Sequence, residues 1–160
     1  MVMWEGILMD TDQSEPLLRV FTKEVPEIAN GLVEIKAVAR MPGIRSKVAI
    51  MSRSPNIDAM IVCVGAAGTR LHRIIDQLNG ERIELVHWHE APETLIVNAL
   101  QPAKIGGVFL DPPNHRATVV VSEDQLSLVA GDRGSQNLEL ASRLSGWRIE
   151  VTTGESKKDR

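Results

Sequence analysis

The stretch DAMIVCVGAAGTRLHRIIDQLNGERIEL, residues 58–85, returns in altered form as DQLSLVAGDRGSQNLELASRLSGWRIEV at residues 124–151. A shift of 66 residues aligns the two stretches, and eight of the 28 positions are then identical. Both stretches consist of an apolar segment, Gly-x-x-Gly, an amphipathic segment, a glycine and an alternating segment typical of a strand. The chain is therefore expected to contain the same small unit twice.

Hydrophobic periodicity predicts the elements of the first unit. Apolar residues at 17, 18, 20, 21 and 25 indicate a short helix that stops near Pro26. Alternating residues after position 33 indicate two strands joined by a turn at Pro42-Gly43. The expected elements are a helix at 17–25, strands at 33–40 and 47–52, a helix from Asn56 or Asp58 to Val64, a helix from Gly68 to Leu78 and a strand at 82–88.

The second unit is predicted to repeat this order. Its expected elements are a helix at 92–100, strands at 104–110 and 116–122, helices at 124–130 and 136–145 and a strand at 147–152. Each unit then has the order α-β-β-α-α-β, so the predicted fold class is α+β, with two small domains in tandem. The predicted boundaries are a lead-in at 1–13, a first domain at 14–90, a second at 91–153 and a polar tail at 154–160.

The Gly-x-x-Gly segments between paired helices are the candidate binding sites. Glycine lets a ligand approach the backbone closely, and the helix that follows begins with free N–H groups at its positive dipole end. A phosphodiester backbone can lie across such a loop while the bases contact an aliphatic surface beside it. Because the segment recurs at the same place in both units, the sequence favours binding of RNA or another single-stranded nucleic acid.

Composition and charge exclude several classes of protein. The 160 residues include 21 acidic and 18 basic side chains, for a net charge of −3, so a basic field over the whole surface is excluded. Five aromatic residues, none of them tyrosine, do not suit folds that stack bases on aromatic platforms. No apolar run is long enough to cross a bilayer, no secretory leader is evident, and Cys63 is the only cysteine. A cytoplasmic protein without a membrane partner is expected.

Several segments resemble one known family. They are EVPEIANG (24–31), VEIKAVAR (33–40), PNID (55–58), VGAAG (64–68), NALQPAK (98–104), DQLSL (124–128) and SGW (145–147). In this order they resemble the tandem type II KH region of the NusA family of bacterial transcription termination/antitermination factors. The resemblance extends over residues 14 to 152, without the S1 domain and the N-terminal polymerase-binding domain of that family.

The resemblance implies that both KH units bind single-stranded, nascent RNA on one rigid surface and modulate pausing, termination or antitermination. RNA polymerase or other transcription factors are the implied protein partners. The implied RNA-binding residues are Gly65, Ala66, Ala67, Gly68, Thr69, Arg70 and Arg73 in the first unit, and Gly131, Asp132, Arg133, Gly134, Ser135, Gln136 and Asn137 in the second.

Departures from the family pattern keep two alternatives open. The family places a basic residue in the first loop where this chain has Ala66-Ala67, and the second loop has Asp132 and one extra residue. Together with a pI near 5.8, these features favour a protein–protein interaction module on a KH scaffold. The other alternative is a KH protein that acts in ribosome assembly or as an RNA chaperone.

Other candidate sites have simpler interpretations. His87 and His89 form half of a possible metal site, with Glu90 nearby, but are better interpreted as surface residues. The acidic residues Asp10, Asp12 and Glu15 are interpreted as a solvated lead-in.

The remaining candidates are interpreted as core or turn residues. Cys63 is expected to be a packed thiol and Trp147 a core residue. Three cations around one turn are expected either to contact RNA or to be solvated: Arg40, Arg45 and Lys47. The sequence shows no P-loop, no His-Glu-x-x-His motif, no nucleophile elbow and no acid–base constellation, so no enzyme activity, cofactor or metal is expected.

Overall fold

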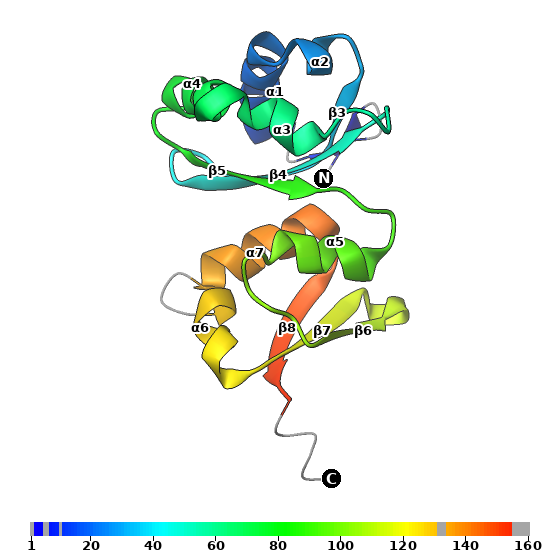
Figure 1. Cartoon of the computed structure of the whole chain (residues 1–160). Helices are drawn as coiled ribbons and strands as arrows, with labels where there is room; N and C mark the ends of the chain where they lie inside the picture. Colours follow the sequence, from blue (N-terminus) through cyan, green and yellow to red (C-terminus); the bar gives the residue numbers. More distant parts are fainter. Residues whose placement is uncertain (1, 5–6, 10, 131–133, 155–160) are drawn as a thin grey trace. The chain divides into compact units, whose positions relative to one another are not determined.

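The computed structural model describes residues 2–4, 7–9, 11–130 and 134–154 (Figure 1). The chain divides into two compact units, residues 1–88 and residues 89–160. Within the described residues, no helix combines the length and the apolar character that crossing a bilayer requires.

The first unit is a sheet covered by helices on one face. Its elements are β1 (Val2–Trp4), β2 (Ile7–Met9), α1 (Thr11–Glu24), α2 (Pro26–Ala29), β3 (Val33–Met41), β4 (Arg45–Ser52), α3 (Ala59–Val64), a 3-10 turn (Ala66–Gly68), α4 (Thr69–Gln77) and β5 (Arg82–His87). The strands follow the order β1-β2-β3-β4-β5. Strand β4 is antiparallel to β3 and parallel to β5, so the α-β-β-α-α-β part of this unit ends on a parallel strand.

The first unit contains more structure before residue 17 than the sequence indicated. Helix α1 begins at Thr11, because its first turns are polar and add nothing to the apolar pattern that begins at Leu17. Strands β1 and β2 pair antiparallel, and β2 joins β3 in parallel with Leu8 opposite Ala37. Strands of three residues are too short for alternation to be detected in the sequence.

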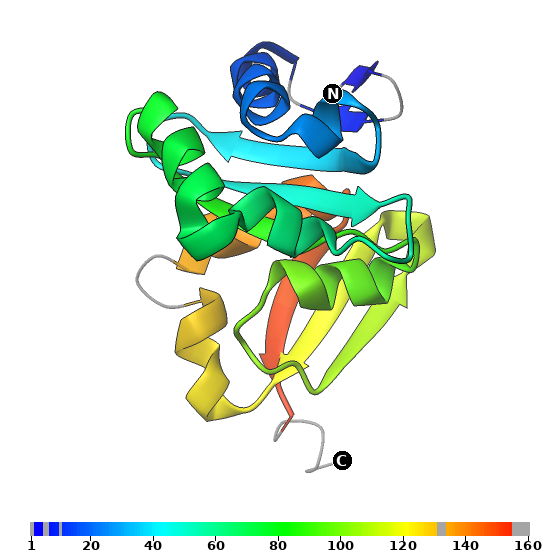
Figure 2. The same ribbon diagram turned by 45° about the horizontal axis from the view of Figure 1, so that its top comes forward.

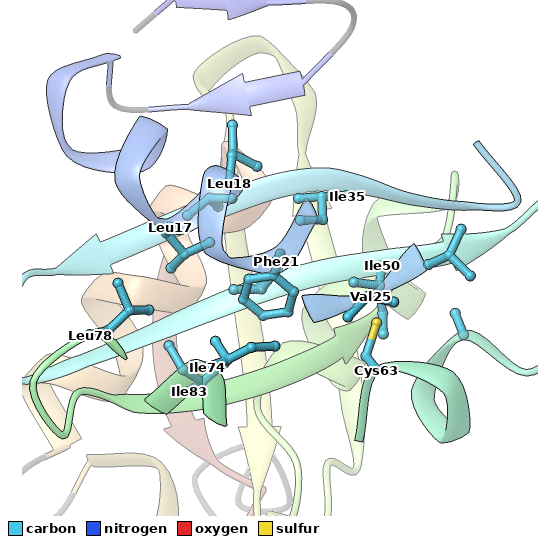
Figure 3. Packing of buried hydrophobic residues seen from close by; sticks show 14 residues of the cluster. Leu17, Leu18, Phe21, Val25, Ile35, Ile50, Cys63, Ile74, Leu78 and Ile83 are labelled. Carbon is cyan, nitrogen blue, oxygen red and sulfur yellow. The ribbon is translucent and has the colours of Figure 1, made fainter. Parts of the chain in front are cut away.

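The core of the first unit lies between its helices and the sheet. Phe21 of α1 is fully buried at the centre of the cluster in Figure 3, between side chains of β3, β4, β5, α3 and α4. The Cys63 sulfur points toward Val25 and Ile50 (Figure 3). Burial of these large side chains in one continuous cluster fixes α3 and α4, and hence the loop between them, against the sheet.

The second unit has the same order in a smaller form. Its elements are α5 (Pro92–Ala99), β6 (Gly107–Asp111), a 3-10 turn (Pro112–Asn114), β7 (Arg116–Val121), α6 (Glu123–Ala130), α7 (Gly134–Ser145) and β8 (Arg148–Thr153). Strand β7 is antiparallel to β6 and parallel to β8. Helix α5 contacts β6, and α6 and α7 contact β8 (Figure 2). The predicted α+β class and the α-β-β-α-α-β order are confirmed in both units.

Candidate nucleic-acid interface

The first Gly-x-x-Gly segment is a tight connection between α3 and α4. Asp58 caps the start of α3 by accepting hydrogen bonds from the N–H groups of Met60 (2.8 Å) and Ile61 (3.3 Å). The helix ends where the Gly65 N–H donates to the Ile61 carbonyl at 2.9 Å. The Gly68 N–H then donates back to the Gly65 carbonyl at 3.1 Å. These bonds join the end of α3 to the start of α4 within four residues.

The backbone of this loop is left-handed at three positions. Gly65, Ala67 and Gly68 have φ angles of 78°, 55° and 76°. A Cβ at Gly68 would meet nothing within 4 Å, so glycine is required there only by its φ angle. A Cβ at Gly65 would lie 2.9 Å from Arg70 Cγ and 3.0 Å from Arg70 Cβ, so glycine is required there by space as well.

The outer side of the loop carries backbone and methyl groups. Ala66 and Ala67 are exposed, and so is Thr69, whose hydroxyl donates to the Ala66 carbonyl at 2.8 Å. Next to the loop, Ile61 of α3 is 70% exposed. A phosphate here would meet main-chain groups and the first turn of α4, beside an apolar surface.

The two arginines predicted on α4 lie in different surroundings. Arg73 is exposed. Arg70 is half-buried: its Nη1 donates to the Val62 carbonyl at 3.0 Å and pairs with Glu27 Oε1 of α2 at 3.0 Å. The sequence identified Arg70 as a candidate but missed Glu27, although Glu27 lies in a segment that carries the family resemblance.

The second loop is described only in part. Gly131, Asp132 and Arg133 lie outside the described residues, as do the surroundings of Gly134 and Ser135 at the start of α7. Gln136 is half-exposed. Asn137 is only 8% exposed, and its Nδ2 donates to the Leu128 carbonyl at 3.4 Å.

Arg70 and Asn137 make the same contact in the two units. Val62 and Leu128 both lie three residues before the first glycine of their loop, and each carbonyl accepts from a side chain in the first turns of the next helix. The donor is five residues after Gly65 in the first unit and six residues after Gly131 in the second. The extra residue of the second loop therefore lies before Asn137.

The cations around the β3–β4 turn are engaged with carboxylates. Arg40 Nε lies 3.0 Å from both carboxylate oxygens of Glu81, which also accepts from Ser46 and, at 2.9 Å, from the Gly43 N–H. Burial alone would raise the pKa of Glu81, but these hydrogen bonds and the Arg40 charge hold its pKa below the ordinary value.

A second carboxylate gathers the remaining cations of this region. Lys47 is only 1% exposed, and its Nζ lies 2.6 Å from Glu84, which also pairs with Arg45. Burial lowers the pKa of Lys47, while Glu84 opposes that shift. The expectation that Arg40, Arg45 and Lys47 are solvated or contact RNA is therefore replaced by a partly buried ion-pair cluster.

The other candidate residues, two histidines and a tryptophan, lie outside the two Gly-x-x-Gly segments. His87 and His89 are exposed, and His89 Nδ1 accepts from the Ala91 N–H at 3.0 Å. Within the described residues, no group of three His, Cys, Asp or Glu side chains is placed to hold a metal ion. Trp147, expected in the core, is half-buried instead, with its ring 5.0 Å from that of His115.

Two further candidates concern Cys63 and the acidic lead-in. Cys63 is buried as expected, and burial, with the nearby Glu27, raises the pKa of its thiol to about 11. Asp10 and the side chain of Asp12 lie outside the described residues, whereas Glu15 pairs with Arg19.

Two units with this strand order, each with a Gly-x-x-Gly segment between its paired helices, define a tandem KH-domain protein. Family models agree: residues 12–88 match the NusA-like first KH domain, and residues 92–159 match the NusA-like second KH domain. The chain belongs to the NusA-like tandem KH family.

Curated relatives support this assignment. The chain is 42% identical over 150 residues to the transcription termination/antitermination protein NusA of Thermus thermophilus and 43% identical over 135 residues to that of Bacillus subtilis. It is 38% identical over 157 residues to NusA of Rickettsia conorii. These matches cover 94%, 84% and 96% of this chain but only 38%, 36% and 31% of the relatives, so the chain spans about a third of their length.

A solved structure has the same fold at low identity. The crystal structure of APE1850 matches with a TM-score of 0.61 at 20% identity, covering 85% of this chain and 96% of that one. At this identity the likeness concerns the fold alone.

Proposed function

We propose that this chain binds single-stranded RNA through its two Gly-x-x-Gly loops and acts, without catalysis, in transcription termination or antitermination. The observation that carries the proposal is the exposed loop 65–68 at the start of α4, in a chain whose two halves match both NusA-like KH domains. RNA polymerase or another transcription factor is the proposed protein partner, in the cytoplasm.

In the first unit, the proposed site uses main-chain groups more than charge. The RNA backbone lies across Gly65, Ala66, Ala67 and Gly68, where the positive dipole end of α4, which has no side-chain cap, favours a phosphate. The exposed Arg73 supplies a cation one turn further along the helix. Bases contact the apolar surface that includes Ile61.

In the second unit, residues 131–137 are proposed to take the corresponding place. Arg133 and Gln136 are the proposed contacts to the RNA backbone, and the acidic Asp132 weakens that contact by repulsion. Asn137 supports the loop from inside through its hydrogen bond to Leu128.

Fluorescence anisotropy with labelled A-rich and mixed single-stranded RNAs tests the proposal. The full chain should bind at low salt and lose affinity as salt rises, and Ala66→Asp/Ala67→Asp should weaken binding by at least about tenfold because two carboxylates would face the phosphates. Aspartate tolerates the left-handed conformation of residue 67, so this variant should remain folded.

A matched variant controls for the added charge. Asn79→Asp/Gln101→Glu adds the same two charges at exposed positions outside both loops. It should bind nearly as well as the unchanged chain. Equal losses in both variants, or no binding by the folded chain at low salt, would contradict RNA binding by the loops.

A further inference from the structure

The Arg70 side chain connects three elements around the first loop. It leaves α4, passes against Gly65, and reaches the Val62 carbonyl of α3 and the Glu27 carboxylate of α2 with the same Nη1 atom, at 3.0 Å in each case. Among the described loop residues 65–70, no other side chain hydrogen-bonds to both α2 and α3. Arg70 thus lies behind the loop, joined to the elements that hold the loop in place.

The contact with Gly65 links this side chain to the loop conformation. Gly65 has a φ angle of 78°, and the Arg70 Cβ and Cγ atoms occupy the space where a side chain at Gly65 would lie. A change in the Arg70 rotamer would move Cγ away from Gly65 and release the Val62 carbonyl, while Arg70 Cβ and the Arg70 backbone N would stay beside Gly65. The loop conformation and the Arg70 position are therefore mechanically coupled.

The positive charge of Arg70 is already paired with a carboxylate of the protein itself. Its guanidinium and the Glu27 carboxylate are both less than a third exposed, which limits screening by water and salt. The two charges also act in opposite directions on the thiol of Cys63, whose pKa Glu27 raises and Arg70 lowers, as expected for charges held beside α3. A guanidinium neutralised in this way has little charge to offer a phosphate.

The second unit makes the corresponding contact without a charge. Asn137 donates to the Leu128 carbonyl from the place that Arg70 occupies in the first unit. What the two units share is a side-chain donor to the carbonyl three residues before the loop, not a cation.

We propose that Arg70 is a positioning residue, anchored by Glu27, that holds loop 65–68 in its RNA-binding conformation and makes no contact with RNA phosphate. The proposal rests on RNA binding by the first loop, and it reassigns the phosphate contact expected of Arg70 to Arg73 and the loop backbone. Glu27 becomes part of the site's support although it does not face the ligand.

Glu27→Gln gives opposite outcomes for the two roles of Arg70. If Arg70 positions the loop, loss of the ion pair should lower RNA affinity by about threefold in anisotropy. If Arg70 contacts phosphate, freeing it from Glu27 should raise affinity. Glu90→Gln, at an exposed position, controls for the change in net charge.

Salt dependence separates Arg70 from Arg73. Arg73→Ala should reduce the slope of log affinity against log salt by about 0.7, because one phosphate contact is lost. Arg70→Ala should lower affinity and leave that slope unchanged. A slope loss at Arg70, or tighter or unchanged binding by Glu27→Gln, would overturn the proposal while RNA binding by the chain stands.

Amide hydrogen exchange tests the support of the loop without RNA. In the free protein, Glu27→Gln and Arg70→Ala should speed exchange of the Gly65 and Gly68 N–H groups, which donate to the Ile61 carbonyl of α3 and to the Gly65 carbonyl, relative to Glu90→Gln. Unchanged exchange would overturn the positioning role. Failure of the unchanged chain to bind RNA would instead remove the proposed function, and the exchange result would still report whether Arg70 holds the loop.

Discussion

Glu81 has no exposed surface, and yet its carboxylate is ionised because every side of it meets a donor. Arg40, Ser46 and the Gly43 N–H converge on it and tie the β3–β4 turn to the start of β5. A buried ion pair is a weak source of net stability, but removal of one partner leaves the other charged and without compensation. Removing the charge of Glu81 is therefore expected to have a large effect on the stability of the fold.

Glu81→Gln should lower the free energy of unfolding by about 3 kcal/mol, because the buried Arg40 would lose the carboxylate that now meets it through both oxygens. Urea denaturation followed by circular dichroism measures the loss. Glu93→Gln, at an exposed position of α5, should change stability by less than about 0.5 kcal/mol. A loss at Glu81 no larger than that control would show that the cluster does not stabilise the fold.

The same carboxylates make stability depend on pH. Glu81 and Glu84 both have pKa values below the ordinary 4.5, chiefly through hydrogen bonds and cations that outweigh the effect of burial. Their stabilisation is therefore fully present above pH 4.5 and is lost as the pH falls through the lowered folded-state pKa values. Urea midpoints measured from pH 7 down to pH 3 should fall, and Glu81→Gln should flatten that fall.

The sequence was least informative about which charged side chains pair with one another. The sequence placed Arg40 and Lys47 on two strands and Arg45 in the connection between them, but it does not reveal that Glu81 and Glu84 come beside them from the start of β5. The same limit applies to Arg70. Its position on a helix could be predicted from the sequence, but its pairing with Glu27, which lies 43 residues away, could not. Pairing across distant elements depends on the packed fold, which periodicity does not encode.

At the scale of elements, the α3–α4 connection distinguishes its two glycines. Both have positive φ angles, but only at Gly65 would an added Cβ meet other atoms, those of the Arg70 side chain and backbone N. Sequence reasoning identified this loop and its flanking helices, because glycine, capping and apolar spacing are local signals. The difference between the glycines comes from Arg70 and could not be read from the loop itself.

Gly65→Ala should lower the free energy of unfolding by about 3 kcal/mol, since it adds a close contact with Arg70 to the conformational cost. Gly68→Ala, which meets open space, should cost about 1 kcal/mol. Urea denaturation of the two variants checks the order. Equal losses would contradict the role assigned to Arg70 packing.

For the whole molecule, most cations of the first unit are paired internally. Arg53 pairs with Glu34 and Arg82 with Glu84, in addition to the pairs of Arg40, Arg45, Lys47 and Arg70 with glutamates. The chain as a whole carries a charge of −3. RNA bound to the first unit therefore meets few unpaired cations among the described residues, Arg73 being one, and its binding there relies mainly on the loop backbone and apolar contacts.

The slope of log affinity against log salt should accordingly be shallow, with a magnitude below about 2, because each phosphate contact of a single strand adds about 0.7. Anisotropy titrations at several salt concentrations measure the slope. A magnitude above about 4 would mean that the RNA contacts many more cations than the loops provide.

The repeat of the α-β-β-α-α-β unit was predictable because a fixed shift of 66 residues preserves glycines and apolar positions. The predicted lead-in at residues 1–13 contained no detectable pattern, and the structure places β1 and β2 there as an extension of the first sheet. Short strands acquire their conformation from the sheet that they join, and this explains why local sequence did not reveal them.

Ala67 carries a conformational cost at an exposed position of the first loop. Its backbone, at φ 55°, costs an ordinary L-residue about 1 kcal/mol, which asparagine or glycine would largely avoid. The native chain thus keeps a methyl group at an exposed position where a polar or smaller residue would be conformationally cheaper. Replacing Ala67 with asparagine or glycine is therefore a way to raise the stability of the protein, at the place where the ligand is proposed to lie.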